Sequence, residues 1–271
     1  MREFGYRGRD GCRLFATTVG EGPAVVLLHG GGPDHHSLLP LAHELAAAHT
    51  VVLPDVRGYG RSHCADPARH TWSSYAEDVV ALLDQLGLDQ AAVGGTGLGA
   101  TITLRAALEH PDRVSAAILV SVEDIEDDAA KAEEIAFMDA FAERVRTQGV
   151  EAAWAPILPG LAPIIGTLVR DAIPRSDQDS VAAAAAIGRD RAFRDVAELA
   201  PITAPTLVFP GIDRRHPAAL AERVAQVLPD ARLVPDAFSA DLRTADDLAA
   251  ALGPEIRRFL AQIDHGCRRG C

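Results

Sequence analysis

The sequence predicts an α/β protein, built as a doubly wound, mostly parallel sheet with an inserted helical cap. Apolar runs at residues 24–28 and 50–54 are typical of strands that are buried on both faces. Segments with helical apolar spacing separate such runs, and this alternation implies right-handed parallel crossovers. Between residues 123 and 200 the helical patterning continues without strands, which indicates an insertion.

The expected elements follow from local patterns along the chain. Residues 2–18 alternate as a β-hairpin does, with a turn at Arg9-Asp10-Gly11. The other expected strands are 24–28, 50–54, 91–93, 115–121, 205–209 and 231–234. The expected helices of the sheet layers are 37–49, 74–86, one that ends before Pro111, 217–228 and 245–263. Within the insertion, helical patterning covers 134–150, 152–170 and 181–194, broken by Pro156, Pro159, Pro163 and Pro174.

This order predicts three parts of the chain. Residues 1–122 and 201–264 form the sheet core, and residues 123–200 form a helical cap over its edge. Residues 265–271 are expected to be a flexible tail.

Composition excludes several classes of function. A net charge of -12 disfavours a nucleic-acid partner, and no apolar run reaches the length of a membrane span. The beginning of the chain has no apolar segment of the signal-peptide type. The four cysteines have no spacing typical of a metal site or of disulfides. We therefore expect a cytoplasmic monomer or homodimer that acts on a small molecule, with no metal and no cofactor.

The stretch 90–114 carries the sharpest functional signal. A short apolar strand leads into Gly95-Thr96-Gly97-Leu98-Gly99 and then into an amphipathic helix. Such a turn lifts one side chain to the top of a parallel sheet, at the positive end of a helix, and its motif is G-x-S-x-G. Here the serine position is occupied by Gly97. A register shift that made Thr96 the nucleophile would put Leu98 where helix and strand approach closely, so Thr96 is expected to bond to backbone instead.

Four motifs in order resemble those of the α/β-hydrolase family, in its capped subclass. They are His29-Gly30-Gly31-Gly32-Pro33, the loop from Asp55 to Ser62, the turn just described with its trailing Glu109-His110-Pro111, and Pro205-Thr206-Leu207-Val208-Phe209-Pro210-Gly211. The triple-glycine loop looks like that of carbon–carbon bond hydrolases and of proline iminopeptidases. The resemblance implies a nucleophile, an acid and a histidine in that chain order.

The implied triad is degenerate in this sequence. The nucleophile position is Gly97, and the usual acid position, three residues after Gly211, holds Arg214. Asp213 or Asp124 are alternative acids. No histidine occurs in residues 235–241, where the family places it. The loss of both the serine and the histidine argues for a natural departure from triad chemistry.

The remaining candidates are an oxyanion hole and groups that move protons. The resemblance places oxyanion donors at the Gly31 and Leu98 amides, which need no side chains. With them, the candidate substrate-binding residues are Gly32, Thr96, Gly97 and Trp154, the last in the expected cap. Histidine titrates near neutral pH, and a nearby carboxylate can also transfer protons. The candidate catalytic residues are therefore Asp34, His35, His36, Asp213 and His216. The alternative role for the histidines is structural, at helix starts.

Three hypotheses about function follow. The first is an enzyme that acts on a small, largely apolar carbonyl compound without a triad, by non-covalent hydrolysis, elimination, isomerisation or cyclisation. The second is a small-molecule-binding protein that has lost catalysis. The third is an ordinary ester or lactone hydrolase whose nucleophile is misplaced or mutated.

Overall fold

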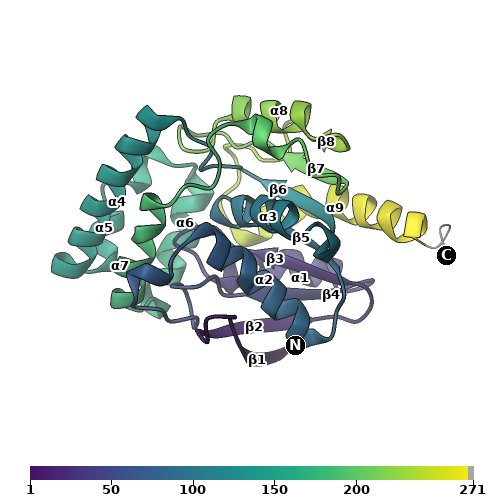
Figure 1. The fold of residues 1–271 in the computed structure, drawn as a ribbon, viewed down its shortest axis with the longest axis horizontal. Helices are drawn as coiled ribbons and strands as arrows, with labels where there is room; N and C mark the ends of the chain where they lie inside the picture. The colour runs from purple at the N-terminus through teal and green to yellow at the C-terminus, as the bar shows by residue number, and fades with distance from the viewer. Residues whose placement is uncertain (268–271) are drawn as a thin grey trace.

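An eight-stranded sheet forms the centre of the protein (Figure 1). The structure is a computed structural model that describes residues 1–267. Strand order is β1-β2-β4-β3-β5-β6-β7-β8; β2 pairs antiparallel with both of its neighbours, β1 and β4, and all other neighbouring strands pair in parallel. The strands are β1 Arg2–Arg7, β2 Arg13–Val19, β3 Ala24–Leu28, β4 Thr50–Pro54, β5 Ala91–Thr96, β6 Val114–Val120, β7 Thr206–Phe209 and β8 Ala231–Leu233. The predicted fold class is confirmed.

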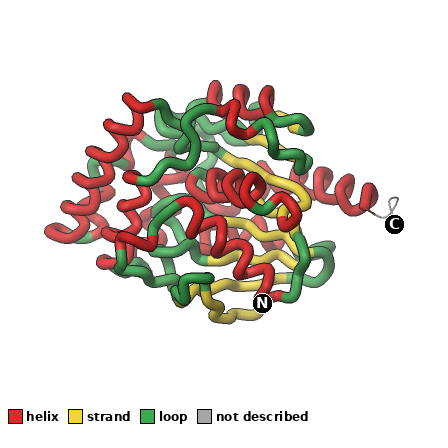
Figure 2. Tube along the Cα trace, in the orientation of Figure 1, coloured by secondary structure: helices red, strands yellow, loops and turns green. Residues whose placement is uncertain are grey.

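Helices cover both faces of this sheet (Figure 2). They are α1 Leu39–Leu45, α2 Trp72–Leu86, α3 Leu98–Glu109, α8 Ala218–Val227 and α9 Ala245–Cys267. Alternate strand residues point to opposite faces, so Val25 and Leu27 pack with α1 and α9, whereas Val26 and Leu28 pack with α2 and α3. In residues 1–267, every helix is too short or too polar to cross a membrane.

Two expected helices of the sheet layers differ most from their predicted bounds. The helix expected at 37–49 is a 3-10 turn, η1 His35–Leu38, followed by α1, which ends at Leu45. The last helix continues through Cys267, three residues into the predicted tail. The rest of that predicted tail, residues 268–271, lies outside the described residues.

The segment between β6 and β7 is helical and gathers at one end of the sheet (Figure 1). Its α-helices are α4 Asp128–Gln148, α5 Val150–Trp154, α6 Pro163–Ala172 and α7 Gln178–Ala184, and its 3-10 turns are η4 Leu158–Gly160, η5 Ile173–Arg175, η6 Ala185–Arg189 and η7 Val196–Leu199. The helical patterning predicted at 152–170, with breaks at its prolines, corresponds to α5, η4 and α6. Pro163 begins α6, because a first-turn proline loses no helical hydrogen bond.

Close packing of glycines fixes the turn between β5 and α3. A Cβ on Gly99 would overlap the Leu28 carbonyl, and one on Gly95 would overlap the Gly99 backbone. The helix can therefore lie directly on the end of the sheet. Gly97 itself has φ 51° and ψ -117°, and its N–H donates to the Val120 carbonyl at 2.9 Å.

A buried arginine anchors the loop after β4, which carries Tyr59 towards the site. Arg57 Nε donates to Asp78 Oδ2 at 2.9 Å, and Nη2 donates to Asp78 Oδ1 at 2.7 Å and to Asp10 Oδ1 at 3.1 Å. Its side chain is only 1% exposed. A guanidinium that spans two carboxylates in this way ties the loop to α2 and to the β1–β2 turn.

We predict that Arg57→Met lowers the free energy of unfolding by about 3–5 kcal/mol, because it leaves the buried carboxylate of Asp78 without its partner. Arg189→Met is the matched control, since Arg189 and Asp139 form a pair that is 62% and 50% exposed. It should cost about 0–1 kcal/mol. Urea unfolding of both variants makes the measurement, and equal losses would show that the Arg57 cluster contributes no more than a surface pair.

Candidate active site

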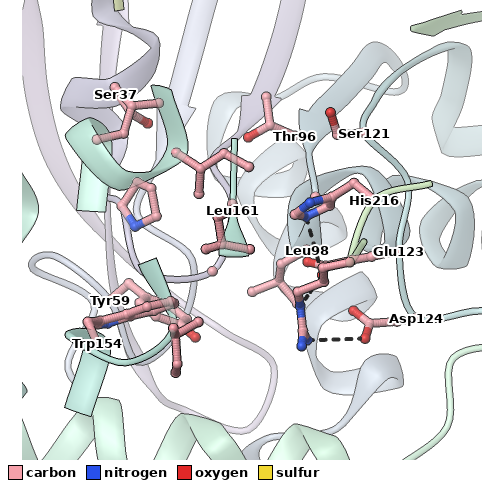
Figure 3. Close-up of a pocket in the computed structure, with 18 of the residues that line it drawn as sticks. Ser37, Tyr59, Thr96, Leu98, Ser121, Glu123, Asp124, Trp154, Leu161 and His216 are labelled. Atoms are coloured by element: carbon pink, nitrogen blue, oxygen red, sulfur yellow. Dashed lines mark hydrogen bonds and ion pairs between the residues drawn. The ribbon is translucent and has the colours of Figure 1, made fainter. Parts of the chain in front are cut away.

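A largely apolar cavity of about 110 Å³ lies between the carboxyl ends of the strands and the helical segment (Figure 3). The ends of β3 and β5 and the beginning of α3 provide its floor. Residues of the segment between β6 and β7 provide most of the apolar wall, among them Phe141, Trp154, Ile157, Leu161 and Ile164. The polar groups gather on one side, where Figure 3 shows Glu123, Asp124 and His216, across the cavity from Trp154 and Tyr59.

The elbow keeps its backbone conformation but presents no side chain. A Cβ built on Gly97 would lie 3.1 Å from Glu123 Oε1 and 3.3 Å from His216 Nε2. Glu123 follows β6 and His216 follows β7, so the parallel sheet brings them together at one edge. A carboxylate and an imidazole thus face the point where a nucleophile would stand.

His216 is held in one orientation by Asp213. The Asp213 Oδ1 atom lies 2.9 Å from His216 Nδ1 and also accepts the His216 backbone N–H at 2.9 Å. The other ring nitrogen, Nε2, lies 3.4 Å from Glu123 Oε2. Both partners of this second pair are buried, with side chains 8% exposed. The ring therefore bridges two carboxylates.

Charge pairing outweighs burial at these groups. Burial lowers the pKa of His216, but Glu123 and Asp213 raise that pKa to about 10. Burial raises the pKa of Glu123, but Arg215 and His216 bring that pKa down to about 2. Burial likewise opposes ionisation of Asp213, yet its hydrogen bond with His216 lowers the pKa to about 2. At neutral pH the site holds an imidazolium between two carboxylates.

Arg215 connects this cluster to the helical segment. Its Nε donates to Glu123 Oε2 at 2.6 Å, and its Nη2 donates to Glu134 Oε1 of α4 at 2.9 Å. Asp124 Oδ1 lies 3.8 Å from Nη2. Burial and the charge of Glu123 raise the pKa of Asp124 well above its usual range.

Comparison with known proteins agrees with the fold described above. A model of the alpha/beta hydrolase fold matches residues 23–150. A thermophilic esterase from Thermogutta terrifontis superimposes with a TM-score of 0.81 at 24% identity, over 97% of this chain and 99% of the esterase. The chain is an α/β-hydrolase-fold protein.

Two further similarities indicate the range of this fold. A 2-hydroxy-6-oxo-6-phenylhexa-2,4-dienoate hydrolase from Burkholderia cepacia is 31% identical over 121 residues, which is 42% of this chain and 41% of that enzyme. The matched part of the chain thus spans about two fifths of this curated relative. The bottromycin epimerase BotH, solved with bottromycin A2, has a TM-score of 0.70 and 23% identity, over 97% of this chain and 99% of the epimerase.

Several residues singled out in the sequence meet at the cavity of this α/β-hydrolase-fold protein. Those that line it are Gly31, Thr96, Gly97, Leu98, Trp154 and His216. Asp213 lies behind His216 and orients it. Gly32 contacts the cavity wall from outside, since a Cβ there would lie 2.7 Å from Trp154 Cζ2.

Asp34, His35 and His36 do not line the cavity. Asp34 caps η1 and accepts a hydrogen bond from Arg175 Nε at 2.6 Å. His35 Nδ1 pairs with Asp55 Oδ1 at 2.8 Å, and His36 Nδ1 lies 3.1 Å from Asp34 Oδ1. Ligand atoms of the three residues lie within 4.8 Å of one another, as metal ligands would. Arg175 and Asp55 already occupy this cluster, which holds the loop in place.

Sequence reasoning missed Glu123 and Arg215. It considered Asp124, on the loop after β6, as one of two alternative acids. Glu123 and Asp124 both line the cavity, but Glu123 is the one that faces Gly97. The available signal was the position of both loops, after neighbouring strands that end at the same sheet edge as the elbow. Which residue of a loop turns inward depends on backbone angles that short loops set only in the folded protein.

We predict that NMR titration finds His216 protonated at pH 7, with a pKa near 10. Because the folded pKa exceeds the ordinary 6.5, the stabilisation from this ion pair is complete below pH 6.5 and disappears as pH rises through about 10. Glu123→Gln should lower this pKa, while Glu133→Gln, the same change at an exposed position of α4, should not. A His216 pKa below 6.5 would mean that burial dominates.

Proposed function

We propose that this protein catalyses proton transfer on a small, largely apolar carbonyl compound, without a covalent intermediate. One observation carries the proposal: Glu123 and His216 face Gly97, which has no side chain. Glu123 Oε1 and His216 Nε2 would lie 3.1 and 3.3 Å from a Cβ at this position. Acid–base groups are present, whereas the attacking hydroxyl is missing. The reaction class is therefore isomerisation, epimerisation or elimination next to a carbonyl.

The backbone provides the complementary group for the carbonyl oxygen. Leu98 is the first residue of α3, so its N–H has no carbonyl one turn back in the helix and points along the positive end of the helix dipole. Gly31 lies beside it, since a Cβ there would be 4.0 Å from Leu98 Cβ. Both amides border the cavity, where they would stabilise a negative oxygen.

In the proposed reaction, every proton and charge is accounted for by groups of the site. Glu123 accepts the proton of the carbon next to the carbonyl, and the C–H electron pair becomes the C=C bond of an enolate whose oxygen binds the two amides. His216 Nε2 then donates its proton to a different position or face of the enolate. Transfer of a proton from Glu123 Oε2 to His216 Nε2, which are 3.4 Å apart, restores the starting charges.

The helical segment supports this chemistry by closing the cavity. We propose that residues 123–200 act as a cap, because the apolar wall formed by Phe141, Trp154 and Leu161 would exclude water from the enolate. A small, largely apolar substrate is the partner that such a wall fits. The fold has a neighbour described as an epimerase, which shows that its scaffold also hosts chemistry other than hydrolysis.

Hydrolysis is the second candidate, favoured by the curated relative that is a hydrolase. In that case Glu123 would activate a water molecule in the space above Gly97, and the same amides would bind the tetrahedral oxyanion. A pocket that only binds its ligand is the remaining alternative.

Product analysis in D2O distinguishes these candidates. We expect deuterium next to the carbonyl of 2-methylcyclohexanone or of α-methyl lactones and esters, with every other bond intact. Glu123→Gln should slow this exchange at least about 100-fold, because it removes the base, and Glu133→Gln should not. Ester or lactone cleavage without exchange would establish the hydrolase instead. Tight binding without any conversion would leave only the binding role.

A serine placed back at the elbow provides a second test. Gly97→Ser should form little acyl-enzyme with a p-nitrophenyl ester at pH 7, because a protonated His216 cannot accept the hydroxyl proton. Gly97→Ser combined with Glu123→Gln should form it readily, and Gly97→Ala combined with Glu123→Gln should form none. Intact mass gives the measurement. Equally fast acylation of the single and the double serine variants would show that His216 is neutral.

A further inference from the structure

Ser121 has a buried hydroxyl at the cavity that is without a hydrogen-bond partner among the described residues. It follows β6, lies 3% exposed and borders the cavity. Within residues 1–267, its Oγ makes no hydrogen bond, and it is the one buried side-chain atom of this kind whose residue lines the cavity. A buried hydroxyl without a partner is costly, so such a group in a binding cavity indicates a missing ligand atom.

Its position relates it to the reacting centre. The carbonyl of Val120, the residue before it, accepts the Gly97 N–H at 2.9 Å, and Glu123 follows two residues later. Figure 3 shows Ser121 near Thr96, and the register of β5 and β6 pairs Thr96 with Val120. Ser121 therefore lies beside the elbow, next to the proposed base.

The backbone around Ser121 is strained in the way functional sites often are. Among residues 1–267, three residues other than glycine have positive φ, and two of them, Ser121 at 56° and Asp124 at 61°, flank Glu123. This conformation favours glycine. With this backbone conformation, Ser121 and Glu123 both line the cavity.

We infer that the substrate carries a second carbonyl oxygen, which accepts a hydrogen bond from Ser121, on the far side of the carbon that loses its proton. The substrate class is thus a 1,3-dicarbonyl compound, such as a β-keto ester. This inference rests on the proposed function and specifies its substrate. The first carbonyl binds the Gly31 and Leu98 amides, and Ser121 binds the second.

The basicity of the site supports this class independently. Although burial raises the pKa of Glu123, Arg215 and His216 bring it to about 2, so this carboxylate is a weak base. A weak base removes a proton faster from a more acidic C–H bond, and a second carbonyl makes that bond more acidic by delocalising the resulting electron pair. When Glu123 takes the proton, the electron pair spreads over both oxygens, one at the amides and one at Ser121.

The test compares two probes that differ in one oxygen. Ethyl 2-methylacetoacetate is the 1,3-dicarbonyl, and ethyl 2-methylbutanoate has a methylene in place of its ketone. We expect calorimetry at pH 7 to show at least about tenfold tighter binding of the dicarbonyl to the wild type. Ser121→Ala should reduce this preference below about threefold and leave the affinity for the monoester unchanged.

Ser37→Ala is the matched control, because Ser37 also lines the cavity but its hydroxyl already donates to the Asp34 carbonyl at 2.7 Å. It should keep the preference. Ser121→Ala should also fold with an unchanged or higher Tm, since it removes an unpaired hydroxyl. Equal affinity of the wild type for both probes, or a preference kept in Ser121→Ala, would overturn the inference.

Deuterium exchange separates this inference from the proposed function. If the enzyme exchanges the proton at C2 of the dicarbonyl, and does so more slowly in Ser121→Ala than in the wild type, the result supports both the Ser121 subsite and the proton-transfer function. Exchange that is equally fast in Ser121→Ala and in the wild type overturns the Ser121 subsite but keeps the proton-transfer function. Absence of enzymatic exchange for every carbonyl compound overturns the proposed function, while the binding preference still decides the subsite.

Discussion

The site depends on a buried ion cluster in which His216 lies between Asp213 and Glu123. Neither carboxylate would be stable alone at this depth, because burial opposes ionisation of both. The imidazolium and Arg215 compensate for that cost, and Arg215 also reaches Glu134 on α4. The same contacts that hold Glu123 and His216 at the elbow therefore also connect them to α4. Removing any one charge should disturb both the chemistry and the closure of the cavity.

The elbow shows how a scaffold keeps its geometry when a catalytic group is absent. Gly97 retains a left-handed φ of 51°, and the glycines around it let α3 pack on the ends of β3 and β5. The amide of Leu98 stays at the beginning of the helix, where the dipole favours negative charge. Glu123 and His216, which follow β6 and β7, lie around the position that a side chain of residue 97 would occupy. The electrostatic stabilisation that we propose for this site therefore does not depend on a nucleophile.

Sequence patterns predicted the fold well and the site in part. Apolar runs and helix spacing located the strands, because burial on both faces is a property of the residues themselves. Gly97, Leu98 and His216 could be named since the turn and the end of β7 are recognisable from motifs. Glu123 was missed, because its neighbour Asp124 has the same chemistry and only the folded loop decides which one faces Gly97. Asp34, His35 and His36 were chosen for their chemistry, but none of them lines the cavity, because Asp34 binds Arg175 and His36, and His35 binds Asp55.

The central claim is that the elbow has acid–base groups but no nucleophile. The most direct measurement is the intact mass of the wild-type protein after treatment with a fluorophosphonate probe, next to a serine esterase treated in the same way. Our account predicts no adduct on this protein under conditions that label the esterase completely. A stoichiometric adduct, mapped to Thr96, Ser121 or another hydroxyl of the cavity, would contradict it and would identify the protein as an enzyme with a covalent mechanism.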